Sequence, residues 1–194
     1  MIKIAQVDHQ VHELIKNRWS PRSFDERGIE KEKILSLFES ARWASSAYNE
    51  QPWRFVYATK DNRESYDKLL ECANENNRAW ISSAPLLMLA VMKNDMVRDN
   101  KPNRYAMYDL GLATGNIMAE ATSLGLYVHV ISGFDGEKAR TLFNISPAYS
   151  PVTIIAAGCL GSPDALPEKS RTLETSARAR KKIEEFAFEG SFRD

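Results

Sequence analysis

Two arginines on either side of a serine form the first group of residues that could do chemistry. Arg18, Ser20 and Arg22 stand two positions apart, with Trp19 between the first two. Guanidinium groups make paired hydrogen bonds to phosphates and to carbonyl-rich rings. The pattern therefore predicts an anion-binding segment. The alternative is a solvated helix C-terminus, where basic residues are common.

Small polar residues form the second group, in the loop from Ser45 to Gln51. Such a loop exposes backbone and side-chain donors, and Pro52 then fixes the entry to a strand. The alternative is an ordinary helix-to-strand connection. Lys169-Ser170-Arg171 is the third group, again two cations around a hydroxyl. In isolation this run is more typical of a charged surface.

Signatures of nucleophilic and metal-dependent catalysis are missing from the chain. The three histidines are His9, His12 and His129, and no histidine or cysteine cluster has the spacing of metal ligands. No nucleophile elbow, Walker loop or dinucleotide-binding glycine motif is present. We therefore expect no metal site and no protein nucleophile.

Hydrophobic periodicity indicates alternating helices and strands that must position these groups. The apolar run at 86–92 is nearly unbroken, which is typical of a strand covered on both faces. No linker, repeat or low-complexity segment interrupts the alternation, so we expect a single α+β or α/β domain over 1–194. Helices are expected at 7–20, 30–43, 64–76, 105–124, 137–143 and 175–188, and strands at 55–58, 86–92, 127–131 and 152–157.

The helix expected at 105–124 carries the most regular pattern in the sequence. Gly111 and Gly115 lie beside its apolar residues, and their spacing inside a helix favours close helix packing over phosphate binding. Such a stripe fits a helical partner better than a sheet, and the partner can be a helix of a second copy or a helix of the same chain. The stripe consists of Met107, Leu110, Thr114, Ile117, Ala121 and Leu124.

Composition excludes several classes of protein. The 26 basic and 26 acidic side chains balance, so no net charge attracts nucleic acid or an anionic membrane. Apolar runs are too short to cross a bilayer, and polar residues near the N-terminus argue against a secretory signal. Cys72 and Cys159 are interpreted as two buried thiols rather than a disulfide. A cytoplasmic protein is therefore expected.

Together, the three polar groups resemble the motifs of the nitroreductase family of FMN-dependent oxidoreductases, in the expected order from about Glu13 to Leu173. The resemblance implies a three-layer α/β/α sandwich with a mainly antiparallel central sheet flanked by helices. It also implies an interlocked homodimer whose FMN sites lie between the subunits, and on that ground we expect the apolar stripe of the helix at 105–124 to face the second subunit. The opening motif is matched by Arg18, Ser20, Arg22 and Phe24, and the most specific motif by Ser45, Ser46, Asn49, Gln51, Pro52 and Trp53.

The resemblance further implies which residues contact FMN. Arg18, Lys169 and Arg171 would hold the phosphate, and Arg22 would tune the flavin near N1. No protein side chain is expected to be catalytic, because the flavin carries the redox chemistry. The full set of expected cofactor-binding residues is Arg18, Trp19, Ser20, Arg22, Ser45, Ser46, Asn49, Gln51, Asn76, Ile131, Ser132, Gly133, Lys169 and Arg171.

The implied activity is hydride transfer from NADH or NADPH through FMN to a small acceptor such as a nitroaromatic or a quinone. Both substrates would use the same space in turn, which predicts ping-pong kinetics. Polar residues at 94–105 are the candidate lid that selects substrates, with a plain surface loop as the alternative. The alternatives are a specialised flavoenzyme, such as a dehalogenase, dehydrogenase or flavin-cleaving enzyme, and a non-catalytic flavin-binding protein.

Overall fold

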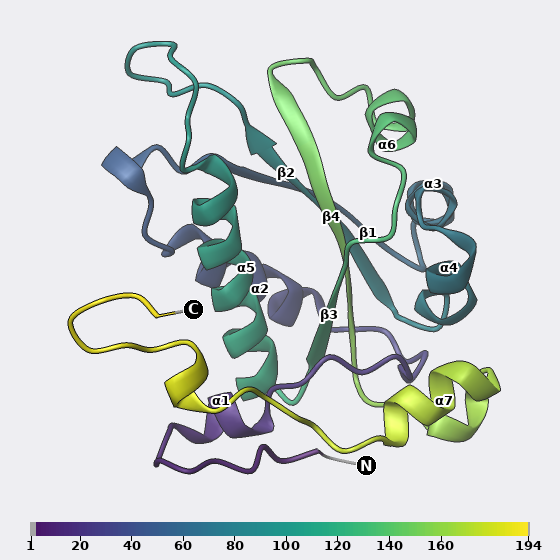
Figure 1. The fold of residues 1–194 in the computed structure, drawn as a ribbon. Helices are drawn as coiled ribbons and strands as arrows, with labels where there is room; N and C mark the ends of the chain where they lie inside the picture. The colour runs from purple at the N-terminus through teal and green to yellow at the C-terminus, as the bar shows by residue number, and fades with distance from the viewer. Residues whose placement is uncertain (1–2, 194) are drawn as a thin grey trace.

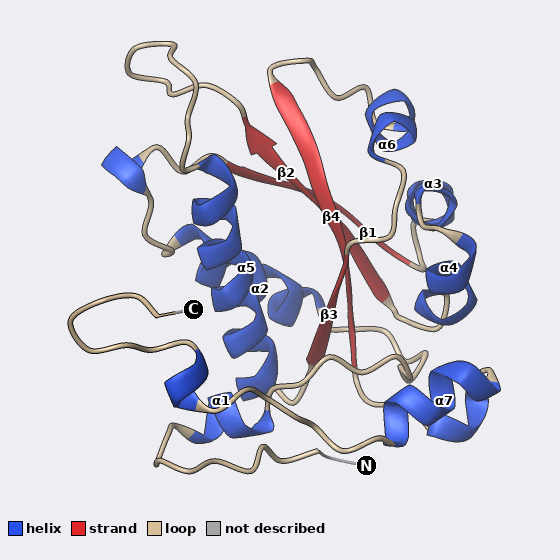
Figure 2. Cartoon of the chain, viewed as in Figure 1, coloured by secondary structure: helices blue, strands red, loops and turns tan. Residues whose placement is uncertain are grey.

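Four antiparallel strands form the centre of the molecule in a computed structural model that describes residues 3–193 (Figure 2). The two apolar strands β2 and β4 are central, and β1 and β3 are the edges. Trp53 pairs with Met92, Leu86 with Ala157, and Tyr127 with Gly158. The order is β1 (Trp53–Thr59), β2 (Leu86–Lys93), β4 (Tyr149–Gly158), β3 (Tyr127–Ile131).

Strand β2 shows why the sheet is covered on both faces. Leu87 and Leu89 belong to one buried cluster, and Leu86 and Met88 belong to another. Because successive side chains of a strand point to opposite faces, an unbroken apolar run needs an apolar layer on each side. The helices supply these two layers.

Helices α2 (Lys31–Arg42) and α5 (Ala106–Ser123) cover one face, and α3 (Arg63–Cys72), α4 (Glu75–Ile81) and α6 (Gly136–Leu142) cover the other (Figure 1). The expected three-layer α+β arrangement with an antiparallel sheet is confirmed. Beyond one end of the sheet lie α1 (Glu13–Asn17) and α7 (Glu168–Thr175). Short 3-10 turns occupy Ala47–Asn49, Pro163–Ala165 and Ile183–Glu185.

Three helix predictions are wrong, two in extent and one because no helix forms. Only Glu13–Asn17 is helical near the N-terminus, and Val7 and Val11 are exposed, so no buried surface supports a longer amphipathic helix. The helix expected at 64–76 breaks at Ala73, and Asn74 caps a new helix by accepting from Asn77 N at 2.9 Å. The helix expected at 175–188 does not form: α7 ends at Thr175, only a 3-10 turn at Ile183–Glu185 follows within the described residues, and the charged sequence there offers no apolar face.

The apolar stripe of α5 packs inside the chain. Leu110, Ile117 and Ala121 are fully or almost fully buried, and they belong to the cluster that α2 and the sheet complete. Met107 is the exception, with 60% of its surface exposed. The prediction that this stripe faces a second subunit is therefore wrong. Helical spacing identifies an apolar face but not what covers it.

Two further observations concern the described residues, 3–193. None of their helices has both the length and the apolar composition needed to span a bilayer. Cys72 and Cys159 are both free thiols, and only Cys72 is fully buried. Burial raises the pKa of the Cys72 thiol to about 11, so it stays protonated at neutral pH.

Candidate functional site

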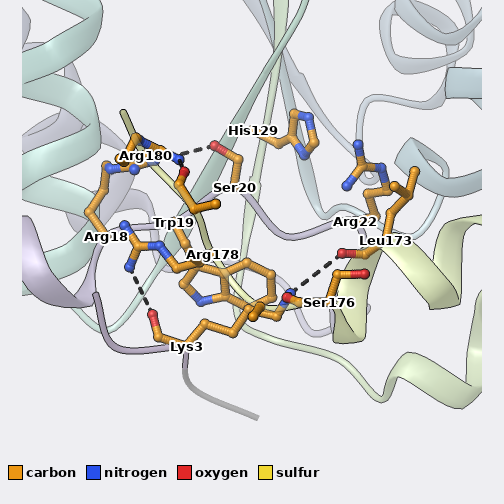
Figure 3. A pocket seen from close by; sticks show the side chains of 12 residues that line it. Lys3, Arg18, Trp19, Ser20, Arg22, His129, Leu173, Ser176, Arg178 and Arg180 are labelled. Atoms are coloured by element: carbon orange, nitrogen blue, oxygen red, sulfur yellow. Dashed lines mark hydrogen bonds between the residues drawn. The ribbon is translucent and has the colours of Figure 1, made fainter. Parts of the chain in front are cut away.

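A basic cavity of about 320 Å³ opens between the segment after α1 and the segment after α7 (Figure 3). In Figure 3, Arg18, Arg178 and Arg180 gather on one side of the cavity, and Arg22 and His129 lie on the other. Five of its lining residues are cations: Lys3, Arg18, Arg22, Arg178 and Arg180.

The segment that carries Arg18 and Arg22 is fixed by hydrogen bonds on both sides. Glu174, at the end of α7, is buried and accepts from Arg22 N at 2.8 Å and from Ser23 N at 3.1 Å. On the sheet side, His129 Nδ1 lies 2.8 Å from the carbonyl oxygen of Pro21. The backbone around Arg22 is thus held between a helix and a strand.

His129 is a neutral member of the cavity wall. Burial lowers its pKa to about 4, with a smaller lowering from Arg22 and an opposing effect of the Pro21 hydrogen bond. Because a carbonyl oxygen can only accept, Nδ1 must carry the proton, which leaves Nε2 as an acceptor. The ring also packs against Trp80, with the centroids 4.5 Å apart.

The cations of this cavity lack carboxylate partners. Within residues 3–193, no ion pair forms at Lys3, Arg18, Arg178 or Arg180. Arg178 instead donates to the carbonyl oxygens of Lys3 and Lys16, both at 2.8 Å. Burial lowers the pKa of Arg18, and the nearby positive charges of Arg178 and Arg180 lower it further.

Such a cluster of like charges suits a doubly charged anion, because the anion would replace mutual repulsion by attraction. Arg18 Nη1 also donates to Ser20 Oγ at 3.3 Å, so this guanidinium is already directed toward the cavity wall that Ser20 shares. Trp19 is buried on the same wall, and its Nε1 has no hydrogen-bond partner among residues 3–193.

Arg22 also lines a second cavity, of about 390 Å³, which places it between the two. Asn76, Trp80, Lys169 and Ser170 contribute to this second cavity. The Arg22 guanidinium lies 5.9 Å from the Trp80 ring centroid. A strongly basic cavity and a second cavity with amide and aromatic groups thus have Arg22 as a common wall residue.

Gly133 fits tightly beside this second cavity. Its carbonyl oxygen accepts from Asn74 N and from Asn77 Nδ2, both at 3.1 Å. A Cβ at this position would lie 2.2 Å from Asn74 Nδ2, so a larger residue requires rearrangement. Of its neighbours, Ile131 is buried at the end of β3 and Ser132 is exposed.

The loop with Ser45, Ser46, Asn49 and Gln51 lies elsewhere. Ser46 Oγ accepts from Gln51 N at 3.1 Å, which closes the loop on itself. Tyr48, Asn49 and Gln51 have φ of 54°, 57° and 46°, which is a left-handed backbone conformation that residues other than glycine seldom adopt.

This loop is joined to the start of α5, because Asp109 Oδ2 accepts from Ala47 N at 3.1 Å. The Arg18 cavity lies at the other end of α5, beside α1 (Figure 1). With 18 residues at about 1.5 Å each, α5 is about 27 Å long, and the two groups lie toward its opposite ends. One chain does not bring them together.

Lys169 and Arg171 lie apart from the Arg18 cavity. Lys169 lines the second cavity with Asn76, and Arg171 lines neither; its Nη2 donates to Leu166 O at 3.4 Å. Arg178 and Arg180, which the sequence prediction did not include, line the Arg18 cavity. They were missed although they repeat the spacing of Lys169 and Arg171, which is the signal that could have identified them. Lys3, His129, Trp80 and Glu174 carried no comparable signal.

Comparisons with known proteins all point to the same protein family. The model of the nitroreductase family matches residues 15–159. A protein of Methanothermobacter thermautotrophicus named "Putative NADH dehydrogenase/NAD(P)H nitroreductase" is 29% identical over 160 residues, which cover 80% of this chain and 79% of that protein.

Solved structures give the same result. A crystal structure described as an oxidoreductase containing FMN has a TM-score of 0.90 and 31% identity, covering 97% of this chain and 96% of that one. A nitroreductase family protein from Clostridium difficile has a TM-score of 0.72 and 26% identity, covering 92% and 97%.

Proposed function

The chain belongs to the nitroreductase family, as its motifs predicted, and we propose that it is an FMN-dependent oxidoreductase that uses NADH or NADPH. The acceptors we propose are nitroaromatic compounds, quinones or similar small molecules, with ping-pong kinetics. One observation carries this proposal: a cavity with five cations shares Arg22 in its wall with a second cavity that has amide and aromatic groups.

The residues of this chain fit FMN. A phosphate dianion needs cations that have no carboxylate partner, and Arg18, Arg178 and Arg180 meet that need within the described residues. The flavin ring needs donors along its polar edge, and Arg22 lines both cavities. When bound, FMN supplies the capacity to accept hydride from a nicotinamide and return it to an acceptor. The chain's own contribution is to bind, orient and tune the flavin.

We propose that the complete site is shared by two copies of the chain. The loop with Ser45 and Asn49 and the Arg18 cavity lie toward opposite ends of α5, a helix about 27 Å long. In a two-fold symmetric pair, the start of α5 in one copy can lie beside the end of α5 in the other. Both half-sites can then face one flavin.

The exposed side of α5 supports such a pairing. Tyr108 is 68% exposed, and a Cβ at Gly111 or Gly115 would meet nothing within 4 Å. The side facing away from the sheet therefore has small residues that permit close approach of another helix. This dimer face is different from the stripe that the spacing predicted.

We propose a cytoplasmic location as well, which fits two free thiols in the described residues. A specialised flavoenzyme of the same family remains the second candidate, since the acceptor pocket alone would differ. A flavin-binding protein without turnover is the third.

The decisive experiment begins with the absorbance spectrum of the purified protein and chromatography of its heat-released cofactor. We expect the spectrum of an oxidised flavin and elution as FMN. Anaerobic addition of NADH or NADPH should bleach the flavin, and a quinone should restore it. A protein that lacks flavin, or that releases FAD, contradicts the proposal. Flavin that stays oxidised with both nucleotides favours the non-catalytic candidate.

A further inference from the structure

Residues 94–105 form an ordered hairpin rather than a plain surface loop. Met96 N donates to Lys101 O and Asn103 N donates to Asn94 O, both at 2.8 Å, and Asp95 and Pro102 form an antiparallel bridge. Side chains on this hairpin therefore have defined positions relative to one another.

Glu50 attaches the hairpin to the loop at 45–51. Its carboxylate accepts from Val97 N at 2.6 Å and from Arg98 N at 3.3 Å. The Arg98 guanidinium lies 3.6 Å from the centroid of the Tyr48 ring, a close cation–π contact. The hairpin thus belongs to the same end of α5 as the loop proposed to face the flavin, and it forms the rim of that half-site.

A third cavity, of about 380 Å³, lies on this hairpin. Met96, Pro102 and Tyr105 give it apolar and aromatic surface, and Arg98, Lys101 and Arg104 give it three cations. Such a combination suits an adenine-type base together with a phosphate group.

The charges in this third cavity are only partly compensated. Asp99 is its single carboxylate, 3.7 Å from both Arg98 Nε and Lys101 Nζ. Arg104 has no ion pair within residues 3–193. Arg104 and Lys101 are exposed, so both can reach an anion that enters from solvent.

We propose that this third cavity binds the adenosine 2′-phosphate of NADPH and makes the protein prefer NADPH to NADH. The inference rests on the proposed function, because the nicotinamide must reach the flavin beside the loop at 45–51. The rest of the dinucleotide then extends over the rim, where Lys101 and Arg104 meet the one phosphate that NADH lacks. The residues that hold FMN have no part in this selection.

The test compares Arg104→Ala and Lys101→Ala with Arg63→Ala, an arginine-to-alanine change on α3, on the opposite face of the sheet. With saturating quinone, we expect wild type to have a kcat/KM for NADPH at least about tenfold above that for NADH, since a charge-assisted contact is lost with NADH. Each hairpin variant should lose about tenfold with NADPH and less than twofold with NADH. Arg63→Ala should change neither value.

A binding measurement on the FMN-loaded protein provides a readout other than turnover. Adenosine 2′,5′-bisphosphate should bind to wild type more tightly than adenosine 5′-monophosphate in calorimetry, and Arg104→Ala should remove the difference. Equal kcat/KM values for the two nucleotides in an FMN-containing, active wild type overturn this inference and leave the proposed function intact. A protein without flavin or turnover overturns both.

Discussion

Arg180→Ala should weaken FMN binding without weakening the fold. Arg180 lines the basic cavity, and within the described residues its guanidinium donates only to the neighbouring carbonyl of Ala179. It therefore supports no other segment, unlike Arg178, which ties Lys3 to Lys16. A charge-assisted hydrogen bond contributes about 1.5–3 kcal/mol, and a loss of about 2 kcal/mol raises the FMN Kd roughly 30-fold.

Stability of the flavin-free protein should change in the opposite direction. Arg180 is one of the two cations that lower the pKa of Arg18, so its removal relieves like-charge repulsion. We expect the Tm of the flavin-free variant to equal or exceed that of flavin-free wild type. In the presence of saturating FMN, the order should reverse, because wild type gains more from binding.

Titration of flavin-free protein with FMN, followed by flavin fluorescence, measures the Kd, and thermal denaturation with and without FMN measures both stabilities. Arg171→Ala is the matched comparison, since Arg171 has the same side chain but lines neither cavity. We expect its FMN Kd to stay within twofold of wild type. If Arg171→Ala raised the FMN Kd more than Arg180→Ala did, the assignment of the phosphate to the Arg18 cavity would be refuted.

Three further predictions concern redox tuning, assembly and pH. Arg22→Ala should lower the two-electron midpoint potential of the bound flavin, because the reduced ring loses a nearby cation; potentiometry that finds no change excludes Arg22 from the ring. Gly111→Glu should shift the protein toward monomer in sedimentation and release FMN, whereas a stable dimer with bound FMN would place the interface elsewhere. The folded-state pKa of His129 is lowered from 6.5 to about 4, so its neutral form stabilises the fold above pH 6.5 and this contribution falls as pH drops toward 4. Urea denaturation at pH 7 and pH 4.5 should show a loss of up to about 3 kcal/mol that is reduced in His129→Asn; equal losses in both proteins would assign the pH dependence to other groups.

Elements with continuous apolar patterns could be predicted closely from the sequence. Strand β2 and helices α2 and α5 all occur where the periodicity indicated, because burial determines both the pattern and the structure. The segments at 7–20 and 175–188 have helical spacing or charge patterns but no surface to bury, and most of each is not helical. In these two segments, helical propensity alone did not produce a helix, because no apolar face is buried.

Local motifs of the site could also be identified, but their arrangement in space could not. Arg18 and Arg22 share a wall of one cavity, as their spacing suggested. Two basic pairs follow in the chain, at 169–171 and 178–180, with the same spacing. The sequence does not show which of the two pairs lies beside Arg18. The structure does, because the chain after α7 runs back and places the second pair next to Arg18 (Figure 3).

The length of α5 has a consequence for mixed populations of the protein. In the proposed dimer, each subunit gives the phosphate end of one site and the loop end of the other, at opposite ends of an 18-residue helix. A copy damaged only near Arg18 can still complete its partner's site through an intact Ser45–Gln51 loop. When such a copy pairs with a copy that is damaged only in the loop, the mixed dimer has one site with both defects and one site with neither. Two inactive alleles expressed together can therefore restore one site in each mixed dimer, which is about a quarter of all sites if the copies pair at random.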